Sequence, residues 1–109
     1  MAGGARALRA HAGLVVVTLG ERGCYYDGAA SGTGWVRGVR VEVVDTTGAG
    51  DGFVAGLIAE LAPAFAAGRR PATLDRPAVE AACAFANRVA ARVVTRFGAT
   101  AALPRRSDL

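Results

Sequence analysis

Residues 45–53, Asp-Thr-Thr-Gly-Ala-Gly-Asp-Gly-Phe, are the part of the sequence best suited to chemistry. They join a predicted strand region to the start of a predicted amphipathic helix. Gly48 and Gly50, separated by one alanine, allow the backbone to turn sharply and to approach a ligand closely. The unpaired N–H groups of the first helical turn, together with the helix dipole, then converge on one point. The segment therefore predicts a binding site for an anion such as a phosphate group.

Asp51 lies at this same point, although a carboxylate repels a bound phosphate. One interpretation is structural, because aspartate is favoured at the N-terminus of a helix. The other is functional: the carboxylate acts as the general base that takes a proton from an attacking hydroxyl group. Residue type and position leave both interpretations open and by themselves favour the structural one.

The nine-residue string resembles the second signature of the PfkB, or ribokinase-like, family of carbohydrate kinases. That signature reads Asp-Thr-x-Gly-Ala-Gly-Asp, followed by a small residue and Phe; here the small residue is Gly52 instead of the commoner alanine, which we expect only to loosen the start of the helix. Fructokinase-type members are the most similar. Three further segments agree with the family in order and spacing: Val-Thr-Leu-Gly-Glu-Arg-Gly at 17–23, Phe-Ala-Asn-Arg-Val-Ala-Ala at 85–91, and Thr-Arg-Phe-Gly-Ala at 95–99.

The resemblance implies a role for each matched residue. Asp51 would be the catalytic base, and the backbone of Gly48, Ala49 and Gly50 would form the anion hole for the transferring phosphoryl group. The residues implied to bind the nucleotide are Thr18, Gly20, Gly23 and Asn87. Many members hold a monovalent cation, usually potassium, behind the anion hole, and the matching residues here are Asp45, Thr47, Val93, Arg96 and Gly98.

The activity implied by the resemblance is ATP-dependent phosphorylation of a sugar hydroxyl, with Mg²⁺ as a second cofactor and K⁺ as a third. The partners would be ATP and, in the full-length enzyme, a sugar. Two alternatives stay open: a nucleoside or other small-alcohol kinase of the same superfamily, and a non-catalytic remnant that only binds nucleotide.

The chain matches only the C-terminal part of the family pattern. The first, glycine-rich signature, the sugar-binding residues and the β-strand lid have no counterpart. The Asn-x-x-Glu motif that organises Mg²⁺ is also missing, since Asn87 is the only asparagine and Ala90 stands three residues later. We therefore expect residues 1–109 to be the nucleotide-binding portion of a sugar kinase, inactive by itself. We also expect self-association through uncovered apolar faces and through an edge strand at 14–19.

Charge and composition exclude several other functions. All 13 basic residues are arginine, the net charge is +4, and the arginines are scattered instead of forming a stripe with interleaved aromatics, so no nucleic-acid partner is expected. No apolar run approaches the roughly 20 residues of a spanning helix, and the N-terminus is not a secretory signal. Cys24 and Cys83, far apart in the sequence, suggest two reduced, packed thiols in a cytoplasmic protein.

The elements expected to position these residues make an α/β fold, a piece of a three-layer α/β/α sandwich. Residues 14–19 form a continuous apolar run typical of a strand covered on both faces of a mainly parallel sheet. A small β-meander follows over 20–44, with strands near 24–26, 35–36 and 39–44. A weak helix is expected at 2–12.

Two helices are predicted in the second half of the chain. Apolar residues recur at helical spacing over 50–65, and Pro63 is expected to end that helix early. Asp75 or Thr73 is expected to cap the next helix, with Pro77 in its first turn. Its apolar stripe consists of Val79, Cys83, Ala86, Ala90 and Val93.

Overall fold

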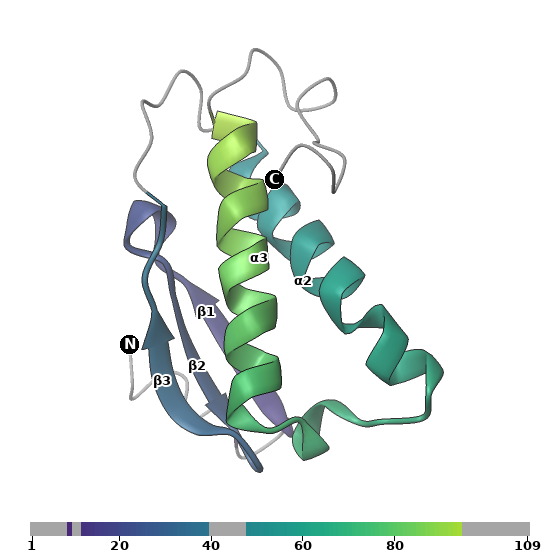
Figure 1. The fold of residues 1–109 in the computed structure, drawn as a ribbon. Coiled ribbons are helices and arrows are strands. Elements are labelled where there is room, and N and C mark those ends of the chain that lie inside the picture. Colours follow the sequence, from purple (N-terminus) through teal and green to yellow (C-terminus); the bar gives the residue numbers. More distant parts are fainter. Residues whose placement is uncertain (1–8, 10–11, 40–47, 95–109) are drawn as a thin grey trace.

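The computed structural model describes residue 9 and residues 12–39 and 48–94 (Figure 1). The expected helix at 2–12, apart from Arg9 and Ala12, and the expected strand at 39–44, apart from Val39, lie outside the described residues. Arg9 is helical, whereas Ala12 is not in a helix and Val39 is not in a strand. The described elements are β1 (Leu14–Thr18), η1 (Gly20–Arg22), β2 (Cys24–Gly28), β3 (Gly32–Val36), α2 (Ala49–Ala66), η2 (Pro71–Thr73) and α3 (Arg76–Val94).

The three strands form an antiparallel sheet in the order β1-β2-β3. Thr18 pairs with Cys24, and Cys24 pairs in turn with Val36. β2 and β3 confirm the two strands that the predicted meander placed near 24–26 and 35–36. The prediction of a mainly parallel sheet is wrong for the described strands, because only residues 19–23 separate β1 from β2, and so short a connection reverses the chain direction. Among the described strands β1 lies at the edge of the sheet, and of its residues only Val15 is buried.

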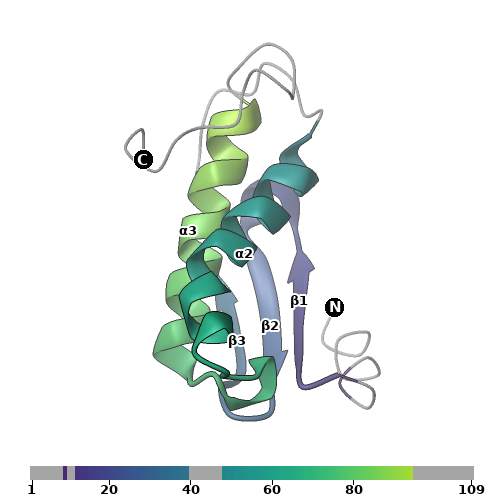
Figure 2. The ribbon, with the colours of Figure 1, turned by 90° about the vertical axis from the view of Figure 1, so that its right-hand side faces the viewer.

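The helices cover one face of this sheet. α3 lies across the sheet and α2 lies along α3, as the two views in Figures 1 and 2 agree. The core between these layers contains Cys24, Tyr26, Phe53, Leu61, Leu74, Val79, Ala82, Cys83 and Ala86. On the opposite face of the sheet, Arg9 pairs with Asp27 at 3.1 Å.

Glycines allow α2 to pack tightly on α3. A Cβ atom on Gly56 would lie 2.9 Å from Val89 Cγ2 and 3.1 Å from Ala86 Cα, and one on Gly52 would lie 2.8 Å from Val93 Cγ2. Both glycines are buried and stand four residues apart, on one face of the helix. The expectation that Gly52 only loosens the helix start therefore misses its packing role.

α2 continues past Pro63 to Ala66, so the prediction that this proline ends the helix early is wrong. Proline at 63 removes one N–H bond to the carbonyl of Ala59, and both residues are exposed, so water can solvate that carbonyl. The turn that terminates the helix after Ala66 contains Gly68, which has φ +84°. Its N–H donates to Phe65 O at 3.0 Å, and Arg69 N–H donates to Ala64 O at 3.0 Å, the bonding pattern of a Schellman motif.

Asp75, one of the two residues predicted to cap α3, is the residue that caps it. Its Oδ1 accepts a hydrogen bond from Ala78 N–H at 3.0 Å. The predicted apolar stripe is confirmed, because Val79, Cys83, Ala86 and Val93 are buried and Ala90 is half-buried.

Polar contacts join the N-terminal half of α3 to the sheet. The hydroxyl of Tyr26 donates to Glu80 Oε2 at 2.6 Å and accepts from Arg76 Nη1 at 2.8 Å. Burial and the bond to Glu80 raise the pKa of Tyr26 to about 12. The thiols of Cys24 and Cys83, both fully buried, belong to the same core cluster, and interaction with Cys24 together with burial raises the pKa of Cys83. Both cysteines are free, in agreement with the predicted packed thiols.

Within the described residues, α2 alone is long and apolar enough to cross a membrane, by length and composition only. Its 18 residues have a mean hydropathy of 1.3. The expectation that the chain contains no such segment is therefore wrong by that criterion, because alanine and glycine keep the whole helix apolar without forming a long unbroken run of larger side chains. The core helix of a soluble protein passes the same test, so this finding alone assigns no membrane contact.

Candidate functional site

The predicted anion hole lies at the start of α2. Gly48 is the N-cap residue and has φ +81°, a left-handed conformation that favours glycine. It offers no side chain to cap the helix, and the first intrahelical bond runs from Gly52 N–H to Gly48 O at 2.8 Å. Gly50 is exposed, and none of the described residues outside its own helical turn has an atom within 4 Å of where its Cβ would stand. The N–H groups of residues 49–51 precede the helical bonding pattern, as those of an anion site do.

Asp51 is exposed in the first turn of α2. The N-cap residue is Gly48, and Asp51 stands three positions later in the first turn, where a carboxylate also interacts favourably with the helix dipole, so the structural and the functional interpretation both stay open. None of the described residues forms a hydrogen bond or ion pair with its carboxylate. A carboxylate placed in this way is accessible to a hydroxyl group that approaches the helix start.

Thr18, Gly20 and Gly23 stand at the turn between β1 and β2. Leu19 N–H donates to Gly23 O at 2.8 Å, and Gly23 N–H donates to Gly20 O at 3.1 Å, so the loop closes on itself. Gly23 has φ +101°, and a Cβ there would overlap the backbone of residues 36–38. This position requires glycine because two backbone segments meet there.

Asn87 holds the same segment from the other side. Its Nδ2 donates to Arg37 O at 3.2 Å and to Val36 O at 3.4 Å, and the residue is only 6% exposed. Its described contacts are thus structural: they tie α3 to the chain that leaves β3. Through this segment Asn87 is connected to the turn that carries Gly23.

α3 links the two groups of predicted site residues. Val93 lies beside Gly52, at the first turn of α2, whereas Asn87 contacts the segment after β3. The two residues are six positions apart, which corresponds to about 9 Å along a helix. Figures 1 and 2 both place η1, the start of α2 and the end of α3 at the same end of the molecule. The structure thus brings the predicted nucleotide residues and the predicted anion hole to one end of the fold.

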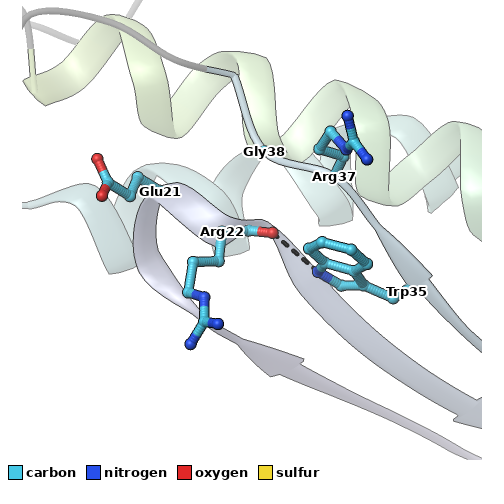
Figure 3. Close-up of a pocket in the computed structure, with 5 residues that line it drawn as sticks. All are labelled: Glu21, Arg22, Trp35, Arg37 and Gly38. Atoms are coloured by element: carbon cyan, nitrogen blue, oxygen red, sulfur yellow. Dashed lines mark hydrogen bonds between the residues drawn. The ribbon is translucent and has the colours of Figure 1, made fainter.

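A shallow depression of about 430 Å³ adjoins η1 (Figure 3). It is lined by Glu21, Arg22, Trp35, Arg37 and Gly38. The indole Nε1 of Trp35 donates to Arg22 O at 2.8 Å, and the Arg37 guanidinium lies 5.9 Å from the centroid of the indole ring. Two arginines against one glutamate give this surface a positive balance, which suits an anionic ligand.

Sequence reasoning missed this depression. Trp35 is not among the predicted site residues, and it is 52% exposed. The available signal was the sequence Trp-Val-Arg-Gly at 35–38, in which alternation along a strand places Trp35 and Arg37 on the same face.

Four of the residues matched to the cation site, Asp45, Thr47, Arg96 and Gly98, lie outside the described residues. Val93 is described and buried. In the part of the chain that the structure describes, no three His, Cys, Asp or Glu side chains lie together as metal ligands would.

Comparison with known proteins matches residues 2–106 to the family described as pfkB family carbohydrate kinase. The chain is 44% identical over 92 residues to the protein named probable fructokinase-6, chloroplastic, from Arabidopsis thaliana. This match covers 84% of the chain and 22% of that protein. The chain therefore spans less than a quarter of the length of this relative.

Solved structures of fructokinases share the fold of this chain. Fructokinase from Vibrio cholerae O395, bound to fructose, ADP and calcium, superposes with a TM-score of 0.78 at 33% identity. A double mutant of that enzyme, bound to fructose, ADP and potassium, gives 0.82 at 32% identity; each match covers 99% of this chain and 33% of the other. Fructokinase from Xylella fastidiosa with bound ATP gives 0.78 at 33% identity, covering 88% of this chain and 30% of the other. The predicted fold class, part of a ribokinase-like α/β fold, is confirmed.

Proposed function

We infer the function of this chain from one premise: it belongs to the pfkB family of carbohydrate kinases. We propose that it is the ATP-binding and catalytic-base portion of an enzyme that transfers a phosphoryl group from ATP to a sugar hydroxyl. The observation that carries this proposal is the start of α2, where an N-cap glycine in the left-handed conformation leaves backbone N–H groups open beside an exposed carboxylate.

In this proposal the backbone N–H groups of Gly48, Ala49 and Gly50 hold the oxygens of the transferring phosphoryl group. They point at the site without rearrangement, because the helix fixes their direction. Asp51 accepts the proton of the acceptor hydroxyl as its oxygen attacks phosphorus. Position and charge stabilisation carry most of the rate in such a reaction, so the backbone geometry matters as much as the carboxylate.

The nucleotide is proposed to lie between this helix start and the turn that carries Thr18, Gly20 and Gly23. The depression beside Trp35 is on that side, and the guanidinium groups of Arg22 and Arg37 favour the negative charge of a nucleotide there. Mg²⁺, when bound to the phosphates, would neutralise charge that develops during transfer. Among the described residues, no three His, Cys, Asp or Glu side chains form a cluster that would hold this ion.

Fructose is the proposed acceptor, because the fructokinases are the relatives that support a substrate class. A potassium ion is proposed behind the anion hole, where Val93 would contribute its main-chain oxygen; the potassium-bound structure of a relative supports a monovalent cation. We also propose a reducing, cytoplasmic location, which the two buried free thiols support.

Nucleotide titration of the purified chain tests the proposal. The chain is expected to bind ATP weakly, and Arg22→Ala together with Arg37→Ala is expected to weaken binding further. Arg69→Ala removes the same charge in the exposed loop after α2 and should leave binding unchanged. A folded chain that shows no ATP binding in calorimetry, or binding that responds equally to all three substitutions, would contradict the assignment of the nucleotide to this end of the fold.

A further inference from the structure

α2 presents large apolar side chains to solvent. Val54 is 52% exposed, Ile58 is 56% exposed and Phe65 is 37% exposed. Spacings of four and seven residues place the three side chains on one face of the helix. We call these three residues the α2 stripe. It lies on the side of the helix away from α3, because the residues that pack on α3 are Gly52, Phe53 and Gly56.

The composition of α2 is that of a helix buried on all sides. Asp51 and Glu60 are its only charged residues in 18 positions, yet just 22% of those positions are buried. Helices that are apolar all round belong in the core of a larger protein or in a membrane. The described part of this chain covers only one face of α2, so a second covering surface is required.

We propose that the α2 stripe is the docking surface for the two thirds of a pfkB fold that this chain does not span. The chain corresponds to 33% of a fructokinase and superposes on it with a TM-score of 0.82, so its elements keep the arrangement that they have within the complete enzyme. A layer large enough to bury the stripe is therefore available in the unmatched part. The surface it presents must be apolar, because Val54, Ile58 and Phe65 offer no polar atom to bond.

The face of α2 that carries the stripe also carries the start of the proposed reaction site. Asp51 precedes Val54 by three residues and Ile58 by seven, and thus lies on the same face of α2. Whatever covers the stripe therefore extends toward the carboxylate. This step rests on the proposed function: the docked part would bring the acceptor hydroxyl to Asp51, and one face of one helix would both assemble the enzyme and receive the proton.

A chimeric protein tests the docking surface, with the matching third of Vibrio cholerae fructokinase replaced by residues 1–109. Ile58→Asp and Val54→Asp are each introduced into the chimera and into the chain alone, and the thermal midpoints are compared. The expected result is a fall of at least about 5 °C in the chimera, where the new charge is buried, and a change of less than about 2 °C in the chain alone. Ala81→Asp, which places the same charge on an exposed alanine of α3, is the matched control and should act equally in both.

Three results would overturn the docking proposal. The first is an equal effect of the stripe substitutions in the chimera and in the chain alone. The second is a parent chimera that does not fold cooperatively. The third is a parent chimera that forms a dimer in sedimentation, or floats with phosphatidylcholine vesicles, and loses that behaviour with Ile58→Asp, because a second copy or a membrane would then cover the stripe in the complete fold. A chimera with a covered stripe and no sugar phosphorylation would instead contradict the proposed function and leave the docking surface intact.

Discussion

The glycines of α2 differ in what their missing side chain makes possible. Gly48 provides a left-handed φ at the helix start, Gly50 stands in open space, and Gly56 allows α3 to approach. The same residue type therefore serves conformation, ligand access and packing within nine positions. Because of this difference, substitution by alanine is expected to have opposite effects on stability at Gly50 and at Gly56.

Gly56→Ala is expected to destabilise the chain, while Gly50→Ala is expected to stabilise it. The new methyl group at 56 meets Val89 and the backbone of Ala86, and such overpacking typically costs about 1–3 kcal/mol, more than the roughly 1 kcal/mol that alanine gains in a helix. At position 50 no atom interferes, so a gain of about 0.4–1 kcal/mol is expected. Urea unfolding measures both; a more stable Gly56→Ala variant would contradict the packing of α2 on α3.

Tyr26 makes stability depend on alkaline pH. Its pKa is about 12 in the folded chain, and the unfolded chain releases the proton near pH 10. Stability supplied by the protonated hydroxyl is thus complete below pH 10 and is lost as pH rises toward 12. The loss should amount to about 2–3 kcal/mol, since one pKa unit corresponds to about 1.4 kcal/mol.

Tyr26→Phe is therefore expected to flatten the slope of unfolding free energy against pH above 10. Glu80→Gln should narrow the pH range over which stability falls, because the hydrogen bond from the Tyr26 hydroxyl to the Glu80 carboxylate contributes to the raised pKa of Tyr26. An unchanged slope in both variants would show that the Tyr26–Glu80 contact is absent in solution.

At the scale of elements, α3 connects every part of the described fold. It contacts α2 through Ala86 and Val89, the sheet through Cys83, and the chain after β3 through Asn87. Opening the fold at the sheet therefore requires α3 to move.

Thiol labelling measures that opening. Cys24 and Cys83 are fully buried between the sheet and α3, and are expected to react with a thiol reagent only at the rate at which the fold opens. Asp75→Ala removes the cap of α3, costs about 1 kcal/mol, and should speed labelling about fivefold. Asp75→Asn, which caps as well, is the control. Rapid labelling of the parent chain under native conditions would contradict the observed packing of α3 on the sheet.

The elements were predictable where one local rule determined them. Helical spacing gave both helices, and Asp75 was recognisable as a cap. Two errors had different causes. Solvent exposure of Ala59 and Pro63 let α2 continue, whereas the reversal of β2 against β1 follows from the short connection at 19–23, a local feature that the prediction of a mainly parallel sheet left out. The close approaches at Gly52 and Gly56 and the contact of Cys24 with Cys83 depend on which residues oppose one another in space, which spacing along the chain does not specify.

The candidate site likewise has one part that was predictable from consecutive residues and one part that was not. The anion-binding start of α2 was predictable because its chemistry lies in consecutive residues. The depression beside Trp35 was not, since it forms only when η1 and the end of β3 come together. Its lining residues form two groups, at 21–22 and at 35–38, and nothing in the sequence between them specifies that the two groups meet.

At the scale of the whole molecule, the chain is expected to show no sugar kinase activity alone. It spans only 22–33% of its fructokinase relatives, and positioning of the acceptor is worth about 7–11 kcal/mol of the barrier in well-oriented reactions. A coupled assay of ADP formation with hexoses, pentoses and nucleosides should give no acceptor-dependent rate. Turnover by the purified chain would mean that residues 1–109 also hold the acceptor.

The most direct measurement of the central claim is fructose-dependent ADP formation by the chimera of Vibrio cholerae fructokinase and residues 1–109, compared with its Asp51→Asn variant. Asparagine keeps the size of the side chain but accepts no proton, so kcat is expected to fall by about 10²–10⁴-fold. ATP affinity should be retained or tightened, because a negative charge beside the phosphates is removed. A folded, ATP-binding Asp51→Asn variant whose kcat stays within a few-fold of the parent chimera would contradict the assignment of Asp51 as the base.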